Sequence, residues 1–146
     1  MKIVIGCDPN AMEAKEKLKI YIEEQKLGTI TDFGDEDIIY AHTAVKAARA
    51  VAAGKYDRGI LLCGTGIGMC IAANKVKGAY AAFATDIYSA KRARLSNDAN
   101  ILCLGAFTLG DKVREELVMA FLTNEYVQGG PSQIKIDAYK QYDKER

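Results

Sequence analysis

The chain has 146 residues, about the length of one domain, and 20 Lys and Arg against 19 Asp and Glu leave a net charge of +1. This even balance argues against a nucleic-acid or anionic-membrane surface, because either would need a clustered basic excess. Hydrophobic residues make up 49% and charged residues 27% of the chain, as in a globular protein rather than a disordered one. We therefore expect a single soluble domain over residues 1–146, with no nucleic acid and no membrane among its partners.

The four cysteines are expected to be reduced. Cys7, Cys63 and Cys103 each lie in or at the end of an apolar run, where an unpaired cysteine behaves as a small buried hydrophobe. No two cysteines have CxxC spacing, and one histidine is too few for most zinc sites, so no structural metal is expected. The apolar run at the N-terminus is too short for a secretory signal, and no stretch approaches the roughly 18 apolar residues of a membrane span. These features predict a cytoplasmic protein.

Short apolar runs alternate with helical patterns. In chain order the expected elements are a strand at 2–6, a helix at 11–25, a strand at 29–33, a helix at 41–53, a strand at 58–62, a helix at 67–76, a strand at 79–84, a helix at 86–95, a strand at 101–104 and a helix at 111–123. Gly28 and Gly54 are the expected stops of the first two helices, and Asp86 is the expected cap of the fourth. The alternation predicts an α/β fold with a parallel sheet covered by helices on both faces.

The C-terminal segment has a different character. A Gly129-Gly130-Pro131 break precedes a polar stretch, 132–146, that is expected to be helical. This tail, taken as residues 131–146, has too few apolar residues to form a core, so we expect it to pack on a neighbouring subunit.

Ligands of parallel sheets bind beyond the carboxyl ends of the strands, near the point where the strand order switches. The run Cys63-Gly64-Thr65-Gly66-Ile67-Gly68 lies there, between the strongest strand and a helix. Its glycines allow the backbone to approach a ligand and turn N–H groups toward an anion, and Thr65 can donate a hydroxyl hydrogen bond. The alternative is a tight turn needed only for close packing of helix on sheet.

Cys63 adds chemistry to this turn. The positive end of a helix dipole favours a thiolate, which can take a proton from carbon or attack an electrophile. The alternative is a buried small hydrophobe, so a catalytic sulfur is expected to face a cavity. Asp8 also ends a strand, where it could bind sugar hydroxyls or cap the first helix. Asn97 precedes the last strand and could simply form a turn.

Four runs carry a resemblance to a known family. They are IVIGCD at 3–8, DRGILLCGTGIGM at 57–69, IAANK at 71–75 and NDANILCLGA at 97–106. In order and spacing they resemble the ribose-5-phosphate isomerase B family, which includes the two subunit types of galactose-6-phosphate isomerase. The resemblance implies a Rossmann-like three-layer domain with a five-stranded parallel sheet, in a dimer or tetramer whose active site is shared between two subunits. It also implies interconversion of aldose and ketose phosphates, of the ribose 5-phosphate type, through an enediolate without metal or other cofactor.

The resemblance also assigns roles to residues. Cys63 matches the family's proton acceptor; a second branch uses a glutamate six positions further on, which is Met69 here. The loop that stabilises the enediolate oxygen matches Gly64, Thr65, Gly66 and Gly68. Substrate-binding positions of the family match Asp8, which holds sugar hydroxyls, the aromatic Tyr40 and Asn97.

Other family positions have changed. Histidines that the family places after its first aspartate and before its Asn-Asp pair, the second of which opens the sugar ring, are replaced by Pro9 and Ser96. Three arginines, two of which grip phosphate across the subunit interface, are replaced by Phe107, Pro131 and Lys135. The base and the oxyanion loop are thus retained, while ring-opening and phosphate-binding groups are largely lost.

Two explanations remain open. In one, the substrate differs: Lys135, Arg92 or Arg94 binds the anion, or the sugar is short or unphosphorylated, and a sugar that cannot cyclise needs no ring-opening histidine. In the other, the chain belongs to a hetero-oligomer, as a galactose-6-phosphate isomerase subunit or a non-catalytic partner subunit. By their own pattern Arg92 and Arg94 indicate a solvated helix face, and His42 a solvated helix start, although His42 could replace the lost acid.

Overall fold

The computed structural model describes residues 1–146 and contains five parallel strands in the order β2-β1-β3-β5-β4. The strands are β1 (Lys2–Cys7), β2 (Thr29–Asp32), β3 (Arg58–Cys63), β4 (Ala81–Phe83) and β5 (Ile101–Gly105). The helices are α1 (Met12–Glu24), α2 (Tyr40–Ala52), α3 (Ile67–Ala73), α4 (Ile87–Leu95), α5 (Asp111–Leu122) and α6 (Gln133–Lys144). The predicted α/β class and five-stranded parallel sheet are confirmed. None of the helices is long and apolar enough to cross a membrane.

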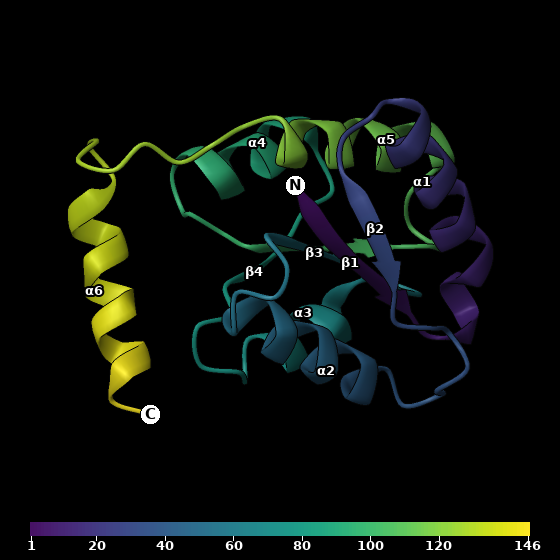
Figure 1. Ribbon diagram of the computed structural model, residues 1–146, viewed down its shortest axis with the longest axis horizontal. Coiled ribbons are helices and arrows are strands. Elements are labelled where there is room, and N and C mark those ends of the chain that lie inside the picture. Colours follow the sequence, from purple (N-terminus) through teal and green to yellow (C-terminus); the bar gives the residue numbers. More distant parts are fainter.

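Helices cover both faces of the sheet (Figure 1). Leu18 of α1, Ala90 of α4 and Phe121 of α5 belong to the apolar cluster on one face. Ala48 of α2 and Met69 of α3 belong to the cluster on the other. The central strands β1, β3 and β5 are buried on both faces, which explains their nearly continuous apolar runs.

Local contacts set the ends of several elements. The Asp86 side chain accepts the Ser89 N–H at 2.8 Å, so the predicted cap of α4 is confirmed. Asp8 caps a short 3-10 turn, Pro9–Ala11, that precedes α1. The left-handed residue that follows α1 is Lys26, with a φ of 54°, so this helix stops before the expected Gly28.

Asn74 ends α3 three residues before the expected boundary and covers the outer edge of β4. Its side-chain amide accepts the Ala81 N–H at 2.9 Å and donates to the Ala81 carbonyl at 2.8 Å. No strand is available to pair these backbone groups, because β4 is the last strand of the sheet.

Helix α6 stands apart from the layered core, beyond the β4 edge (Figure 1). Ile136 of this helix is fully buried, and the Asp143 carboxylate accepts the Gly78 N–H at 2.8 Å and the Tyr80 hydroxyl at 3.0 Å. The Tyr139 ring also packs against Tyr80, with ring centroids 5.3 Å apart. Packing of this tail on a neighbouring subunit concerns an assembly of several chains and stays a prediction.

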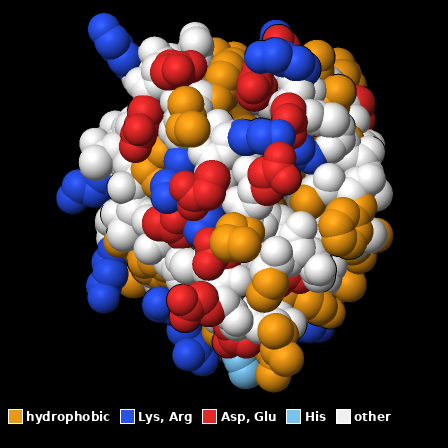
Figure 2. Space-filling view, turned by 90° about the vertical axis from the view of Figure 1, so that its right-hand side faces the viewer, with side chains coloured by type: hydrophobic (Ala, Val, Ile, Leu, Met, Phe, Trp, Pro, Cys, Tyr) orange, Lys and Arg blue, Asp and Glu red, His pale blue; other side chains and the backbone are white.

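On the α1 and β2 side of the molecule, acidic and basic side chains are interspersed (Figure 2). Beneath them the buried Lys15 places its Nζ 2.8 Å from Asp32 and 2.7 Å from Asp35, linking α1 to the segment after β2. Burial alone would raise the pKa of Asp32, but hydrogen bonds from Lys15 and Lys19 outweigh this effect and lower the pKa.

Replacing Lys15 by Met is expected to lower the free energy of unfolding by about 2–4 kcal/mol, because Asp35 loses its cation and Asp32 keeps only Lys19. Lys17→Met, which breaks two exposed ion pairs, should have a much smaller effect in the same urea titration. The stabilisation from a lowered carboxylate pKa is present above its unfolded value, about 3.9, and is lost as the pH falls through the folded value. Lys15→Met should therefore lose less stability than the parent chain between pH 7 and pH 3. Equal stabilities of the two lysine variants would contradict the role given to Lys15.

Candidate active site

Cys63 and Asp8 lie at the carboxyl ends of neighbouring strands. In the β1–β3 pairing, Cys7 is opposite Leu62, and the Asp8 N–H continues the ladder by donating to the Leu62 carbonyl. The chain runs outward from β1 to β2 and returns to β3 on the other side, so the strand order switches between β1 and β3. The structure therefore brings Asp8 and Cys63 together at the position where parallel sheets bind ligands.

The turn after β3 aims a backbone donor at the sulfur. Gly66 has a φ of 82°, and a Cβ at this position would lie 2.7 Å from the carbonyl carbon of Leu104, so only glycine fits. The Gly66 N–H donates to the Cys63 Sγ at 3.1 Å. Thr65 is exposed, and its hydroxyl oxygen accepts the Ile67 N–H at 3.4 Å. The turn is thus both a close packing contact with β5 and a source of polar groups beside the thiol.

Three further backbone donors of the turn are unused. The N–H groups of Gly64, Thr65 and Gly68 donate to no protein acceptor. Unpaired N–H groups at the start of a helix can stabilise negative charge on an oxygen. The predicted oxyanion loop therefore has free donors.

Two aromatic rings border this turn. The Tyr40 ring lies over Gly68, where an added Cβ would be 2.5 Å from the ring, and the Phe107 ring lies over Gly64, with a corresponding distance of 2.9 Å. Tyr40 is 41% and Phe107 72% exposed. Tyr40 was among the predicted site residues. Phe107 was noted only as a lost arginine, because its packing on Gly64 depends on a tertiary contact.

Asp8 is buried and engaged locally. Its carboxylate accepts the Asn10 N–H at 3.1 Å and the Asn10 side-chain amide at 3.4 Å. The capping role that the sequence left open is therefore present, on a 3-10 turn. A role in holding sugar hydroxyls would use the same carboxylate oxygens.

Asn97 and Lys135 do not join this group within one chain. Cys63 is paired with Gly105 at the carboxyl end of β5, whereas Asn97 precedes Ile101 at the amino end. The four residues from Ile101 to Gly105 span about 13 Å. Lys135 lies in the first turn of α6, beyond β4. One chain thus holds the predicted site residues at two separate places.

The expected cavity in front of the sulfur is missing from the single chain. Cys63 is 5% exposed and packs in the apolar cluster with Val4, Met69 and Cys103. It lines none of the five principal cavities. The reason is that its side chain points from β3 toward α2 and α3, under the turn. Any substrate pocket here needs further walls or a movement of this turn.

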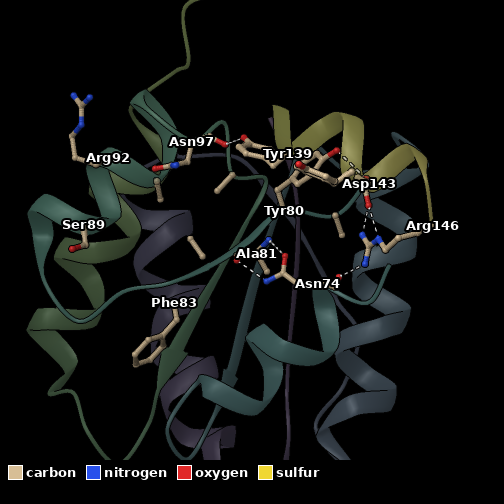
Figure 3. Close-up of a pocket in the computed structure, with 15 residues that line it drawn as sticks. Asn74, Tyr80, Ala81, Phe83, Ser89, Arg92, Asn97, Tyr139, Asp143 and Arg146 are labelled. Atoms are coloured by element: carbon tan, nitrogen blue, oxygen red, sulfur yellow. Dashed lines mark hydrogen bonds and ion pairs between the residues drawn. The ribbon is translucent and has the colours of Figure 1, made fainter. Parts of the chain in front are cut away.

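A cavity beside α6 has a volume of about 650 Å³ and is lined by Asn97 together with Tyr80 and Tyr139 (Figure 3). The Tyr139 hydroxyl donates to the Asn97 carbonyl. In Figure 3 the Arg92 guanidinium points outward from this cavity.

Arg94 differs from its expectation as a solvated residue. It is 3% exposed; its Nη1 lies 3.1 Å from Asp98 and its Nη2 lies 2.8 Å from Glu125. This arginine is therefore structural and is not free to bind an anion. His42 agrees with the expectation of a solvated helix start: its side chain is 65% exposed, with Nδ1 3.0 Å from Asp37.

The other thiols divide into inert and polar ones. Burial raises the pKa of Cys7 to about 12 and that of Cys103 well above its ordinary value. Hydrogen bonds from the Cys103 thiol and from Asn74 outweigh partial burial and lower the pKa of Cys70 to about 7. No group of three or more His, Cys, Asp and Glu side chains is arranged to hold a metal ion.

Known proteins are similar to this chain in sequence and fold over nearly their whole length. A model of the ribose/galactose isomerase family matches residues 3–139. A ribose-5-phosphate isomerase B of Listeria innocua is 44% identical over 98% of this chain and 97% of its own length. A D-erythrulose-4-phosphate isomerase of Pectobacterium atrosepticum is 43% identical over 99% of this chain and 98% of its own length.

Solved structures agree. The ribose-5-phosphate isomerase B of Mycoplasma genitalium, crystallised with bound ribulose 5-phosphate, superposes with a TM-score of 0.91 at 33% identity, covering 99% of this chain and 97% of that one. The Clostridium thermocellum enzyme superposes with a TM-score of 0.92 at 37% identity, covering 99% of each chain. From these matches, together with a cysteine and an amide-rich turn at the switch point, the chain belongs to the ribose/galactose isomerase family and is a sugar-phosphate aldose–ketose isomerase.

Proposed function

We propose that this chain isomerises an open-chain, four-carbon sugar phosphate, using Cys63 as the base. The observation that carries the chemistry is the Cys63 sulfur held 3.1 Å from the Gly66 N–H, beside a turn with unused backbone donors. The matching of Cys63 to the proton acceptor of the family supports the same role. The relative from Pectobacterium atrosepticum that acts on D-erythrulose 4-phosphate supports the substrate class.

The reaction moves one proton between adjacent carbons. The Cys63 thiolate takes the proton from the carbon next to the carbonyl, and the C–H electron pair becomes the double bond of an enediolate. Negative charge then collects on an oxygen of the enediolate. The N–H groups of Gly64, Thr65 and Gly68 can stabilise this charge by donating hydrogen bonds to the oxygen. The sulfur returns the proton to the neighbouring carbon while a hydroxyl proton passes between the two oxygens. Atoms and electrons balance without a cofactor.

The choice of a four-carbon substrate rests on the absence of histidine from the two positions where the family has it. Opening a furanose ring needs a proton donor, yet the family's histidine positions hold Pro9 and Ser96, and the Ser96 hydroxyl is buried without a partner. His42 is solvent-exposed and paired with Asp37. A tetrose 4-phosphate cannot close a five-membered ring, because its O4 is esterified. Such a substrate arrives open and needs no ring-opening group.

A second candidate is isomerisation of ribose 5-phosphate. The specific observation in its favour is 44% identity to the Listeria innocua ribose-5-phosphate isomerase B. A chain without a ring-opening group would then depend on the small open-chain fraction of the pentose phosphate.

The separation of the site residues supports a shared site. Because Asn97 and Lys135 are distant from Cys63 in one chain, we propose that a second copy supplies them in a homodimer or homotetramer. Exposed apolar side chains beside the turn, including Ile67, Ile71 and Phe107, offer a surface for that contact. The second copy would also supply walls for the pocket that the single chain lacks. A related chain in a hetero-oligomer is the alternative partner.

Cys63→Ala is expected to lower kcat by about a thousandfold or more while the thermal unfolding curve stays close to that of the parent, because the variant removes the base and little volume. Cys70→Ala, in the same apolar region, is the matched control and should keep full turnover. Isomerisation and exchange of solvent deuterium into the substrate are measured together. Retention of both by Cys63→Ala would exclude the thiol as the base.

Among erythrulose 4-phosphate, ribose 5-phosphate and galactose 6-phosphate, the first should give the highest kcat/KM. Ser96→His should raise turnover of ribose 5-phosphate and leave that of erythrulose 4-phosphate unchanged, because only the pentose needs its ring opened. Coupled spectrophotometric assays measure kcat and KM for all three sugar phosphates with the parent chain and with Ser96→His. A parent chain that prefers ribose 5-phosphate would refute the four-carbon assignment.

Sharing of the site predicts complementation. Cys63→Ala and Asn97→Ala are each expected to be nearly inactive, and a refolded equal mixture should recover about a quarter of the parent activity, because half of random dimers have one intact site out of two. Mixing each variant with itself is the control. No recovery in mixtures shown to contain hybrid oligomers would mean that both residues act within one chain.

A further inference from the structure

The surroundings of Arg92 set it apart from the other arginines of this region. Arg92 lies on α4 four residues before Ser96, and the Ser96 N–H donates to its carbonyl at 2.8 Å. Residues four apart share one face of a helix, so the Arg92 side chain leaves α4 on the side of position 96.

Two cavities meet at this side chain. Arg92 and Asn97 line the cavity beside α6, and Arg92 lines a second cavity of about 350 Å³ with Pro131 and Ser132. Arg92 therefore borders positions 96, 97 and 131. In the family that the chain resembles, the corresponding positions hold the ring-opening histidine, the substrate-binding asparagine and a phosphate-binding arginine.

Arg92 also has no charged partner within the chain. It makes no ion pair and no side-chain hydrogen bond, and its guanidinium points outward (Figure 3). The carboxylate of Glu125, which lines the smaller cavity, is bound by Arg58 at 2.7 Å and by Arg94 at 2.8 Å. This nearby carboxylate is thus already paired with two other arginines, and Arg92 has no carboxylate partner.

We propose that Arg92 binds the phosphate group of the substrate, in the site of a second copy, in place of the arginine absent at Pro131. This inference rests on the proposed function. A guanidinium can donate two parallel hydrogen bonds to phosphate oxygens, which a lone lysine cannot do. Lys135 is exposed in the first turn of α6, and its N–H donates to the Ser132 carbonyl at 3.1 Å, so it can add a second charge next to the same segment.

The experiment compares Arg92→Ala and Arg92→Lys with Arg49→Ala, which removes an exposed arginine of α2 far from these cavities. KM and kcat are measured for erythrulose 4-phosphate and ribose 5-phosphate, with inorganic phosphate as a competitive inhibitor. Arg92→Ala should raise KM and the phosphate inhibition constant together by roughly 10- to 100-fold with kcat within about threefold, because one charged, bidentate contact is lost. Arg92→Lys should recover part of the loss, and Arg49→Ala should match the parent.

Unchanged KM and phosphate inhibition in Arg92→Ala would overturn the proposal, as would a fall in kcat at constant KM. Calorimetric titration of inorganic phosphate into the parent chain and Arg92→Ala gives a readout that does not need turnover. If the parent chain isomerises no sugar phosphate, the proposed function fails. Loss of phosphate binding on removal of Arg92 would still establish Arg92 as a phosphate ligand, and unchanged binding would reject it.

Discussion

The backbone contact between Gly66 and Leu104 controls the geometry of the candidate site. A side chain at position 66 would collide with the backbone of β5, and the left-handed φ of this residue favours glycine. This close approach fixes the turn between β3 and α3, and with it the direction of the Gly66 N–H toward the Cys63 sulfur. The same turn leaves the N–H groups of Gly64, Thr65 and Gly68 unpaired. The proposed base and the proposed oxyanion donors are therefore positioned by one packing contact.

The order of elements could be predicted from the sequence because buried parallel strands have a strong pattern. Apolar runs such as 58–62 have few other places in a soluble protein, and glycine clusters mark where they end. The expected cap at Asp86 needed only local chemistry. Helix α3 was predicted too long, because Asn74 is drawn into contacts with β4, and sequence patterns do not reveal such a tertiary partner.

The candidate site could be predicted in composition but only partly in arrangement. The amide-rich turn and its cysteine are local in sequence and came together as expected. Arg94 was predicted as solvated because one of its two carboxylate partners, Glu125, lies 31 residues away in the sequence. Asn97 could have been separated from Cys63 at the outset, since residues before a parallel strand lie at the opposite edge from residues after one. Burial of the Cys63 sulfur depends on the packing of α2 and α3, which no local pattern gives.

The amide of Asn74 has a consequence for how the chain behaves among its own copies. At Ala81 it occupies both hydrogen-bonding groups that β4 would otherwise present outward. An open strand edge is a template on which a foreign strand can add and start aggregation. With a side chain in the place of that strand, the β4 edge of the sheet is closed to growth at this residue.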